Sequence, residues 1–284
     1  MEKKHDAGGG RMVEARGGLR MPAFGLGTWR MGEARARRAD EVKAIQLAID
    51  LGARMIDTAE MYGDAESVVG EAIRGRQDGL FIVSKVLPQN ASRRGTVEAA
   101  ERSLAKLGIA CMDLYLLHWE GSHPLEGTLE AFEALKAAGK IRHYGVSNFD
   151  TSAMAAMERL KLGPKVAVNQ VMYSLARRGI ERSLLPWCRE HGVAIMAYSP
   201  LDQGSLKSTA ALKAVAARHG VTPECVAVAW TMRDPLLVSI PKAVKADHLK
   251  ANITAATLLL TSDDLAELER AYPPPKRDVP LDIV

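Results

Sequence analysis

The sequence of 284 residues contains few cysteines and few aromatic side chains. Its three cysteines, Cys111, Cys188 and Cys225, are an odd number, lie far apart and include no CxxC pair. That pattern disfavours a disulfide framework and a zinc site, so we expect three buried thiols and no metal. Aromatic residues make up 5% of the chain, and 38 basic residues face 34 acidic ones. A nucleic-acid-binding protein would show a denser basic stripe with interleaved aromatics, so no nucleic-acid partner is expected.

Long apolar runs are also missing. No window approaches the roughly 18 uncharged apolar residues that a membrane-spanning helix needs. The first residues, MEKKHDAGGGR, lack the apolar centre of a signal peptide. We therefore expect no membrane partner and a cytoplasmic location. The glycines within residues 1–10 favour no single backbone shape, which predicts a flexible N-terminal arm.

Short, nearly continuous apolar runs recur along the rest of the chain. They lie at 23–29, 53–57, 80–86, 112–119, 141–147, 165–171, 193–201 and 235–242. Such runs are typical of strands buried on both faces, as in a parallel sheet. Segments of helical character separate them, for example at 38–53, 67–75, 96–108, 128–140, 151–160 and 182–192.

This alternation predicts an α/β protein made of repeated βα units, with eight strands and about eight helices. The length is close to the roughly 250 residues of a typical TIM barrel. We therefore expect residues 11–284 to form a single (β/α)8 TIM barrel with an N-terminal β-hairpin and a short C-terminal tail. The alternative is a doubly wound open sheet, which usually shows GxGxxG after its first strand, whereas the sequence here reads GLGTW.

Four ionisable side chains stand at the ends of three consecutive predicted strands. Asp57 ends the run at 53–57, Tyr62 lies in the loop that follows, Lys85 ends the next run, and His118 the one after. In a barrel these strand ends converge on one rim. Each residue alone has a structural explanation, such as an ion pair, loop packing or a core histidine. Together they are hard to ascribe to stability, because burying charge costs several kcal/mol unless it is compensated.

Such a quartet can donate a proton to a carbonyl oxygen. A tyrosine with a pKa of about 10 is a weak acid, and a neighbouring ammonium that stabilises tyrosinate makes it a better one. We expect Lys85 to supply that charge, with Asp57 keeping Lys85 protonated and His118 positioning the substrate oxygen. None of these groups can supply a hydride, so reduction requires a cofactor.

The later strand ends offer groups that could hold a cofactor. Ser147, Asn148 and Gln170 provide hydroxyl and amide groups for a carboxamide, and the segment 198–201 begins with an aromatic ring suited to stacking. Lys242 precedes a predicted helix, a suitable environment for phosphate. Ordinary loop hydrogen bonding is the alternative for each of them.

The sequence resembles the aldo-keto reductase family over essentially residues 19–284. The matching motifs are GLGTW (25–29), IDTAEMYGDAE (56–66), VSK (83–85), DLYLLHW (113–119), GKIRHYGVSNF (139–149), NQVMYS (169–174), AYSPL (197–201) and IPKAV (240–244). The family implies a TIM barrel that binds an extended nicotinamide cofactor without a Rossmann domain. Within it, the chain looks like the bacterial branch that includes methylglyoxal reductases, which implies small aldehydes and ketoaldehydes as substrates.

The resemblance also implies roles for individual residues. Asp57, Tyr62, Lys85 and His118 match the catalytic tetrad, with Tyr62 as general acid. The cofactor-binding residues that it implies are Gly27, Thr28, Trp29, Ser147, Asn148, Gln170, Tyr198, Ser199, Pro200, Leu201, Ile240, Lys242, His248 and Asn252. Asn252 could equally be an amide on a helix surface.

Two positions depart from the pattern of many NADPH-preferring members. Ala243 stands where they carry serine, and His248 stands where they carry arginine. Losing the arginine removes a bidentate phosphate partner, which weakens selection for a 2′-phosphate. NADPH is still the expected cofactor because Lys242 remains, with NADH possible.

Trp29 and Trp119 are expected to form apolar walls for the substrate, and the tail from Tyr272 to Val284 to drape over the mouth or to pack against the barrel exterior. The predicted function is NADPH-dependent reduction of small carbonyl compounds by a monomeric enzyme. The alternative is a regulatory or redox-sensing protein of the same fold. A metal-dependent barrel enzyme would need clustered ligands, whereas the remaining histidines are scattered.

Overall fold

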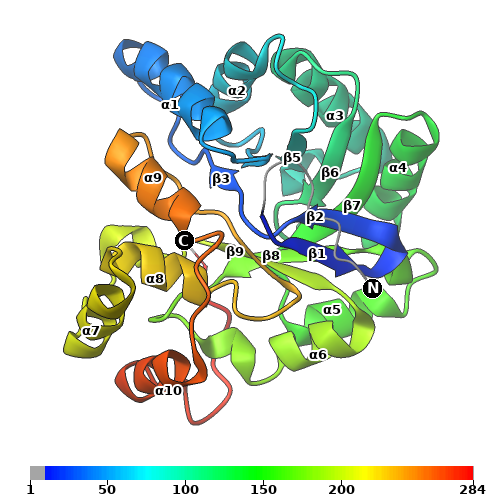
Figure 1. The fold of residues 1–284 in the computed structure, drawn as a ribbon. Helices are drawn as coiled ribbons and strands as arrows, with labels where there is room; N and C mark the ends of the chain where they lie inside the picture. Colours follow the sequence, from blue (N-terminus) through cyan, green and yellow to red (C-terminus); the bar gives the residue numbers. More distant parts are fainter. Residues whose placement is uncertain (1–9, 284) are drawn as a thin grey trace, which may run out of the picture.

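The computed structural model describes residues 10–283 and shows a closed barrel of eight parallel strands (Figure 1). The strands are β3 (Leu26–Gly27), β4 (Met55–Asp57), β5 (Phe81–Val86), β6 (Met112–Leu117), β7 (Ile141–Ser147), β8 (Val168–Met172), β9 (Ala194–Tyr198) and β10 (Leu237–Ser239). Each strand pairs with its neighbours in sequence. A parallel bridge between Phe24 and Ser239 joins the first strand to the last and closes the ring. The predicted (β/α)8 barrel is confirmed.

Helices surround the strands (Figure 1). They are α1 (Arg38–Asp50), α2 (Ala65–Ile73), α3 (Arg93–Leu107), α4 (Leu125–Ala137), α5 (Thr151–Glu158), α6 (Leu184–His191), α7 (Ala210–His219), α8 (Pro223–Trp230), α9 (Ala246–Thr254) and α10 (Ser262–Ala271). The expectation of about eight was too low. Residues 10–283 contain ten, because α7 and α8 both lie between β9 and β10 and α10 follows α9.

Local signals set the helix ends. In α3, the Ser92 side chain accepts a hydrogen bond from the Gly95 amide, and Gly108 takes a left-handed φ of 66°. These are an N-cap and a C-cap that satisfy backbone groups left open at helix termini. The helix therefore begins three residues before the predicted start at 96, where the periodic apolar pattern gave no signal.

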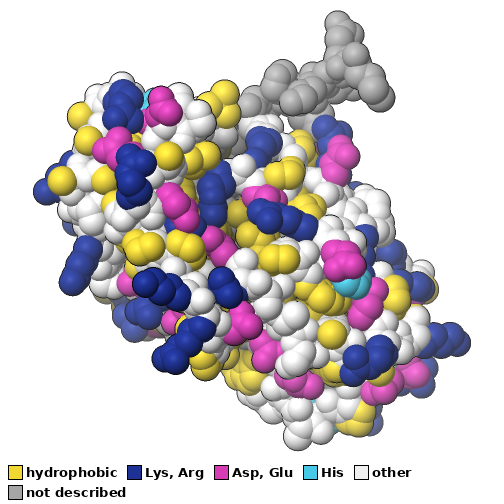
Figure 2. Space-filling view, turned by 90° about the horizontal axis from the view of Figure 1, so that it is seen from below, with side chains coloured by type: hydrophobic (Ala, Val, Ile, Leu, Met, Phe, Trp, Pro, Cys, Tyr) yellow, Lys and Arg dark blue, Asp and Glu magenta, His cyan; other side chains and the backbone are white. Residues whose placement is uncertain are grey.

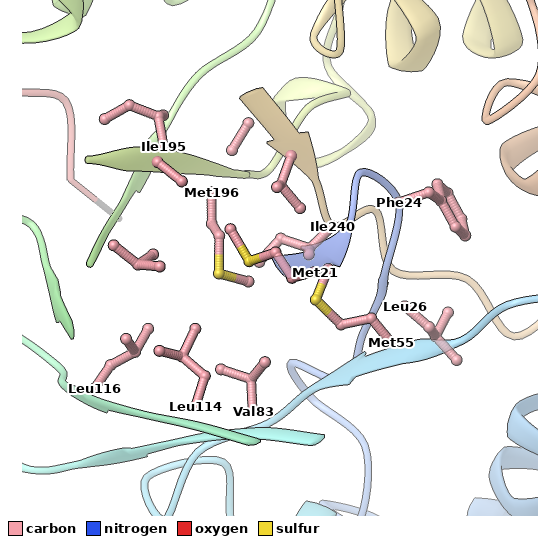
Figure 3. Packing of buried hydrophobic residues seen from close by; sticks show 14 of the residues in the cluster. Met21, Phe24, Leu26, Met55, Val83, Leu114, Leu116, Ile195, Met196 and Ile240 are labelled. Carbon is pink, nitrogen blue, oxygen red and sulfur yellow. The ribbon is translucent and has the colours of Figure 1, made fainter. Parts of the chain in front are cut away.

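An antiparallel hairpin closes one end of the barrel. Its strands are β1 (Met12–Ala15) and β2 (Leu19–Pro22), and Val13 and Met21 are fully buried. Figure 3 shows Met21 directed toward Met55, Met196 and Ile240 in the barrel interior. Because Met55 is the first residue of β4, the hairpin seals the amino-terminal ends of the strands. The carboxyl-terminal ends are left to form a site, as is usual for this fold.

The cysteine prediction was partly wrong. Cys188 and Cys225 are buried, but Cys111 is only partly buried because it lies just before β6, at the rim of the barrel. Across residues 10–283, no helix is long and apolar enough to cross a membrane, and no group of three or more His, Cys, Asp or Glu side chains could hold a metal. The predicted flexible arm of residues 1–10 lies almost wholly outside the described residues. On the face shown in Figure 2, Asp and Glu side chains lie among Lys and Arg.

Arg16 lies in the turn of the N-terminal hairpin and binds the hairpin to the barrel. Its guanidinium donates to the carbonyl oxygens of Val166 (2.6 Å) and Gly163 (3.0 Å), and it pairs with Glu158 at 2.8 Å. Its backbone amide donates to the Gly192 carbonyl at 2.8 Å. The Arg16 side chain is 14% exposed, so water screens these bonds weakly.

We predict that Arg16→Ala lowers the free energy of unfolding by about 2–4 kcal/mol, because it leaves the Glu158 carboxylate and the Val166 carbonyl without their side-chain partner, while the Gly163 carbonyl keeps its bond from the Val166 amide. The measurement is urea denaturation. The matched control is Arg76→Ala, which removes an exposed pair with Asp50 and should cost about 0–1 kcal/mol. Equal losses in the two variants would contradict this account of the hairpin.

Candidate active site

A cavity of about 1110 Å3 opens at the carboxyl-terminal ends of the strands. The residues predicted from the sequence that line it are Gly27, Thr28, Trp29, Asp57, Tyr62, His118, Trp119, Ser147, Asn148, Gln170, Tyr198, Ser199, Pro200, Leu201, Ile240, Lys242, His248 and Asn252. Lys85 is the one predicted residue that does not line it. The structure therefore brings together residues from every strand end that the sequence singled out.

Lys85 and Asp57 form a buried ion pair at the cavity floor, which Asp57 lines. The Lys85 Nζ donates to Asp57 Oδ1 at 2.7 Å and to the Thr58 carbonyl at 2.9 Å. The second carboxylate oxygen, Oδ2, accepts from Gln170 Nε2 at 2.8 Å. The side chains of Lys85 and Asp57 are 0% and 2% exposed. Further hydrogen bonds offset the cost of burying such a pair, and this one receives two, from Thr58 and Gln170.

Tyr62 lies next to this pair. The Lys85 Nζ is 5.0 Å from the centroid of the Tyr62 ring, and Tyr62 meets the His118 ring edge-on with centroids 5.6 Å apart. Burial raises the pKa of Tyr62, and the Lys85 charge opposes that effect without reversing it. Burial lowers the pKa of Lys85, but Asp57 and Tyr62 together outweigh it and the net shift is upward. Both groups are therefore protonated at neutral pH.

His118 is neutral at this site. Burial, and secondly the positive charge of Lys85, lower the pKa of His118 to about 3. Its side chain is largely buried, and its Nδ1 has no hydrogen-bond partner among residues 10–283. An uncharged imidazole can still donate one hydrogen bond to an oxygen in the cavity.

Hydroxyl and amide groups cluster on the wall formed by the ends of β7, β8 and β9. Asn148 Nδ2 donates to the His118 carbonyl at 3.1 Å and to Ser147 Oγ at 3.2 Å, while Asn148 Oδ1 accepts from the Tyr198 hydroxyl at 2.9 Å. Ser147 Oγ donates to the Gln170 carbonyl at 2.8 Å. These contacts fix the orientation of each group, so the wall is organised before any ligand binds.

Backbone strain is concentrated here. Outside glycine, positive φ angles occur within residues 10–283 at Arg30, Asn148, Ser199, Asp202 and Gln203. Four of them line the cavity, and Asp202 lies in the same loop. A positive φ is costly for a residue with a Cβ atom, and such residues cluster at active sites and ligand-binding loops. The loop after β9 carries three of the five.

The far part of the cavity is formed by α9 and the segment before it. Asn252 is 3% exposed and lines the cavity, which removes the alternative of a helix-surface amide. Lys242 and His248 are exposed within the same wall. The charged neighbours of Lys242 are Glu41 and Glu33 as well as Arg37 and Arg30, so charges of both signs lie on this side.

Sequence reasoning missed several lining residues, among them Arg30, Met61, Glu120, Gln203, Thr222, Glu224, Asp247 and Ile283. Arg30 and Glu120 directly follow the two tryptophans that were predicted, so their adjacency was an available signal. Ile283 was not singled out, but it belongs to the tail that was expected to drape over the mouth or to pack against the barrel exterior.

The family model for the aldo/keto reductase family matches residues 23–273. The methylglyoxal reductase YeaE of Escherichia coli K12 is 43% identical over 281 residues, which cover 96% of this chain and 99% of that protein. The glyoxal reductase of Bacillus subtilis is 33% identical over 90% of this chain and 91% of its own.

A crystal structure of an aldo-keto reductase from Klebsiella pneumoniae in complex with NADPH superimposes with a TM-score of 0.92. It is 46% identical and covers 97% of this chain and 99% of its own. The match extends over the whole barrel, including the strands that carry the cavity. The chain belongs to the aldo/keto reductase family.

Proposed function

We propose that this enzyme uses NADPH to reduce small aldehydes and ketoaldehydes of the methylglyoxal type, with Tyr62 as the proton donor. The observation that carries the proposal is the buried Lys85–Asp57 pair directly beside the Tyr62 ring at the floor of a large cavity. Relatives named methylglyoxal reductase and glyoxal reductase, and a related structure that holds NADPH, support the substrate class and the cofactor.

The residues of the cavity fit a nicotinamide dinucleotide. The volume exceeds the range of about 300–1000 Å3 for ordinary ligand pockets, so there is room for an extended ligand and a small substrate. Ser147, Asn148 and Gln170 would hold the carboxamide, and the Tyr198 ring would stack on the nicotinamide. When bound, the reduced cofactor supplies the hydride that no side chain can provide.

The phosphate-bearing parts of the cofactor would lie along the rest of the cavity. The loop residues Ser199 and Leu201 would face the pyrophosphate, and Lys242 the 2′-phosphate. Ala243 and His248 weaken that second contact, since neither replaces a bidentate guanidinium. Because Lys242 remains to contact the 2′-phosphate, NADPH is the preferred cofactor. Because that contact is weakened, NADH is accepted as well.

The side chains of this chain handle the proton. His118, held neutral, donates a hydrogen bond that fixes the carbonyl oxygen next to the Tyr62 hydroxyl. Tyr62 then passes its proton to that oxygen as negative charge develops on it. The Lys85 ammonium stabilises the tyrosinate left behind, and Asp57 keeps Lys85 charged and in place.

Trp29 and Trp119 line the cavity and would provide apolar walls for the substrate. The C-terminal tail also reaches the site, because Ile283 is part of the cavity wall. Two interpretations of the tail were open: that it covers the mouth, or that it only packs against the barrel exterior. This contact favours the first. A regulatory protein of the same fold is the second candidate, and turnover distinguishes the two.

We predict that Tyr62→Phe lowers kcat at least a hundredfold, because it removes the donated proton and leaves the ring in place. The assay follows loss of NADPH absorbance with methylglyoxal, together with NADPH affinity from fluorescence titration, which should change less than threefold. Turnover near the wild-type rate in the variant would contradict the assignment of Tyr62. A wild-type protein that binds NADPH without turnover would favour the regulatory alternative.

The pH profile tests the state of His118. Since its pKa is lowered to about 3, kcat/KM for the aldehyde at saturating NADPH should show no step near pH 6.5. Tyr62 is active when protonated, so activity is full below its pKa and lost as the pH rises through it. The raised pKa of Tyr62 puts that loss above the usual value near 10. A step near pH 6.5 that vanishes in His118→Gln would refute a neutral His118.

We predict that Lys242→Ala raises the KM for NADPH about tenfold or more and changes the KM for NADH much less. The reason is that a 2′-phosphate is present only in the first cofactor. Steady-state kinetics with both cofactors provide the measurement. Lys245→Ala, which removes an exposed lysine that does not line the cavity, is the control. Equal increases for the two cofactors would exclude a 2′-phosphate contact at Lys242.

A further inference from the structure

Arg177 forms a cluster of ion pairs just outside the cavity. It lies in the segment 174–183, which follows β8. Its Nε donates to Asp202 Oδ1 at 3.0 Å, and its Nη1 donates to Asp282 Oδ1 at 3.2 Å. None of these three residues lines the cavity. One guanidinium thus joins two segments that are 80 residues apart in the sequence, the loop after β9 and the C-terminal tail.

The loop after β9 and the C-terminal tail each contribute a residue to the cavity wall. In each segment, that residue directly follows the aspartate that pairs with Arg177. Gln203 follows Asp202 in the loop, and Ile283 follows Asp282 in the tail. The tail also packs against the Arg177 segment, where Gly179 leaves room for it: a Cβ on Gly179 would come within 2.7 Å of Val279 Cγ2. The position of each wall segment therefore depends on the same short stretch of chain.

The loop after β9 is fastened differently at its two ends. At the far end, the Tyr272 hydroxyl donates to the Lys207 carbonyl and accepts from the Thr209 amide at 3.2 Å. The Tyr272 carbonyl accepts in turn from Arg178, whose side chain is 4% exposed. At the near end the side-chain ion pair is that of Arg177, which is 46% exposed.

The loop after β9 therefore has two kinds of attachment. The far end, held by Tyr272 and Arg178, stays attached, whereas the near end, held by Arg177, can detach. The Arg178 guanidinium, 4% exposed and with several partners, is costly to detach, whereas the Arg177 guanidinium is 46% exposed and open to water, although Asp202 beside it is 12% exposed. Ser199, Asp202 and Gln203 have φ angles of 50°, 49° and 56°, so the near end also carries the strained backbone. Opening of the loop is therefore easiest where Arg177 holds it.

We propose that Arg177 is a positioning residue that couples the loop after β9 to the C-terminal tail, so that the two cavity walls open and close together. This inference rests on the proposed function, in which the loop faces the cofactor and the tail faces the substrate mouth. Breaking either ion pair then changes the rate at which the cofactor leaves. Loop opening and product release limit the turnover of many enzymes, so kcat responds as well.

The test measures the dissociation rate of NADPH by stopped-flow fluorescence in the full-length protein. Arg177→Ala should raise this rate about two- to fivefold, the range for loss of an exposed pair. The decisive variant is Asp282→Asn, which alters the tail alone. If the walls are coupled, it raises the rate about twofold, and it adds nothing further when combined with Arg177→Ala. In both variants kcat rises and the KM for methylglyoxal rises with it.

The matched control is Arg189→Ala. Arg189 pairs with Asp234 away from the cavity, with side-chain exposures of 51% and 12%, against 46% and 12% for Arg177 and Asp202. It should lower thermal stability as much as Arg177→Ala does, but leave the NADPH dissociation rate unchanged. A change of the same size in this control would show that the effect of Arg177 is one of general stability, and would overturn the proposal.

Two results separate the failure of this inference from that of the proposed function. If wild type binds NADPH and Asp282→Asn dissociates it at the wild-type rate, the tail is not coupled to the loop and the inference is wrong. If wild type binds no nicotinamide dinucleotide in a fluorescence titration, both the inference and the proposed function are wrong.

Discussion

The ion pair between Lys85 and Asp57 is the constraint on which the site depends. Two opposite charges without solvent exposure are stable only when every remaining lone pair and proton has a partner. Thr58 and Gln170 each add a hydrogen bond to this pair, which fixes the ends of β4, β5 and β8 relative to one another. Burial raises the pKa of Tyr62, and the Lys85 charge partly offsets that rise. Burial is also the main cause of the lowered pKa of His118, and the Lys85 charge adds to it. Burial and this ion pair together therefore set the protonation states of the neighbouring groups.

The two ends of the barrel have different roles. The amino-terminal end is packed for stability, and the carboxyl-terminal end carries the candidate active site. The hairpin fills the amino-terminal end with apolar side chains such as Met21, and Arg16 binds its turn to the neighbouring loops. All five non-glycine residues with positive φ in the described chain lie at the other end or in the loop beside it. A rigid, well-packed scaffold can bear such strained positions where ligands are to be held.

The sequence predicted the strands and the tetrad because both leave local signals. Continuous apolar runs mark strands buried on both faces, and polar residues that end such runs must meet on one rim of a barrel. Helix ends and helix number were less accessible, since caps such as Ser92 and the extra helix α8 interrupt no apolar pattern. The partial exposure of Cys111 also depends on its place at a strand entrance. The ion pairs of Arg177 could not be found, because they join segments that are distant in the sequence and meet only in the folded protein.

Gln170 reaches from β8 to Asp57 on β4, a residue 113 positions earlier in the chain, with a single 2.8 Å bond. The same amide would bind the nicotinamide in the proposed function. A cofactor that rotates this side chain also alters the electrostatic environment of the proton donor. Redesign of the enzyme for unnatural cofactor analogues will therefore change its acid–base chemistry unless position 170 retains a donor directed at that carboxylate.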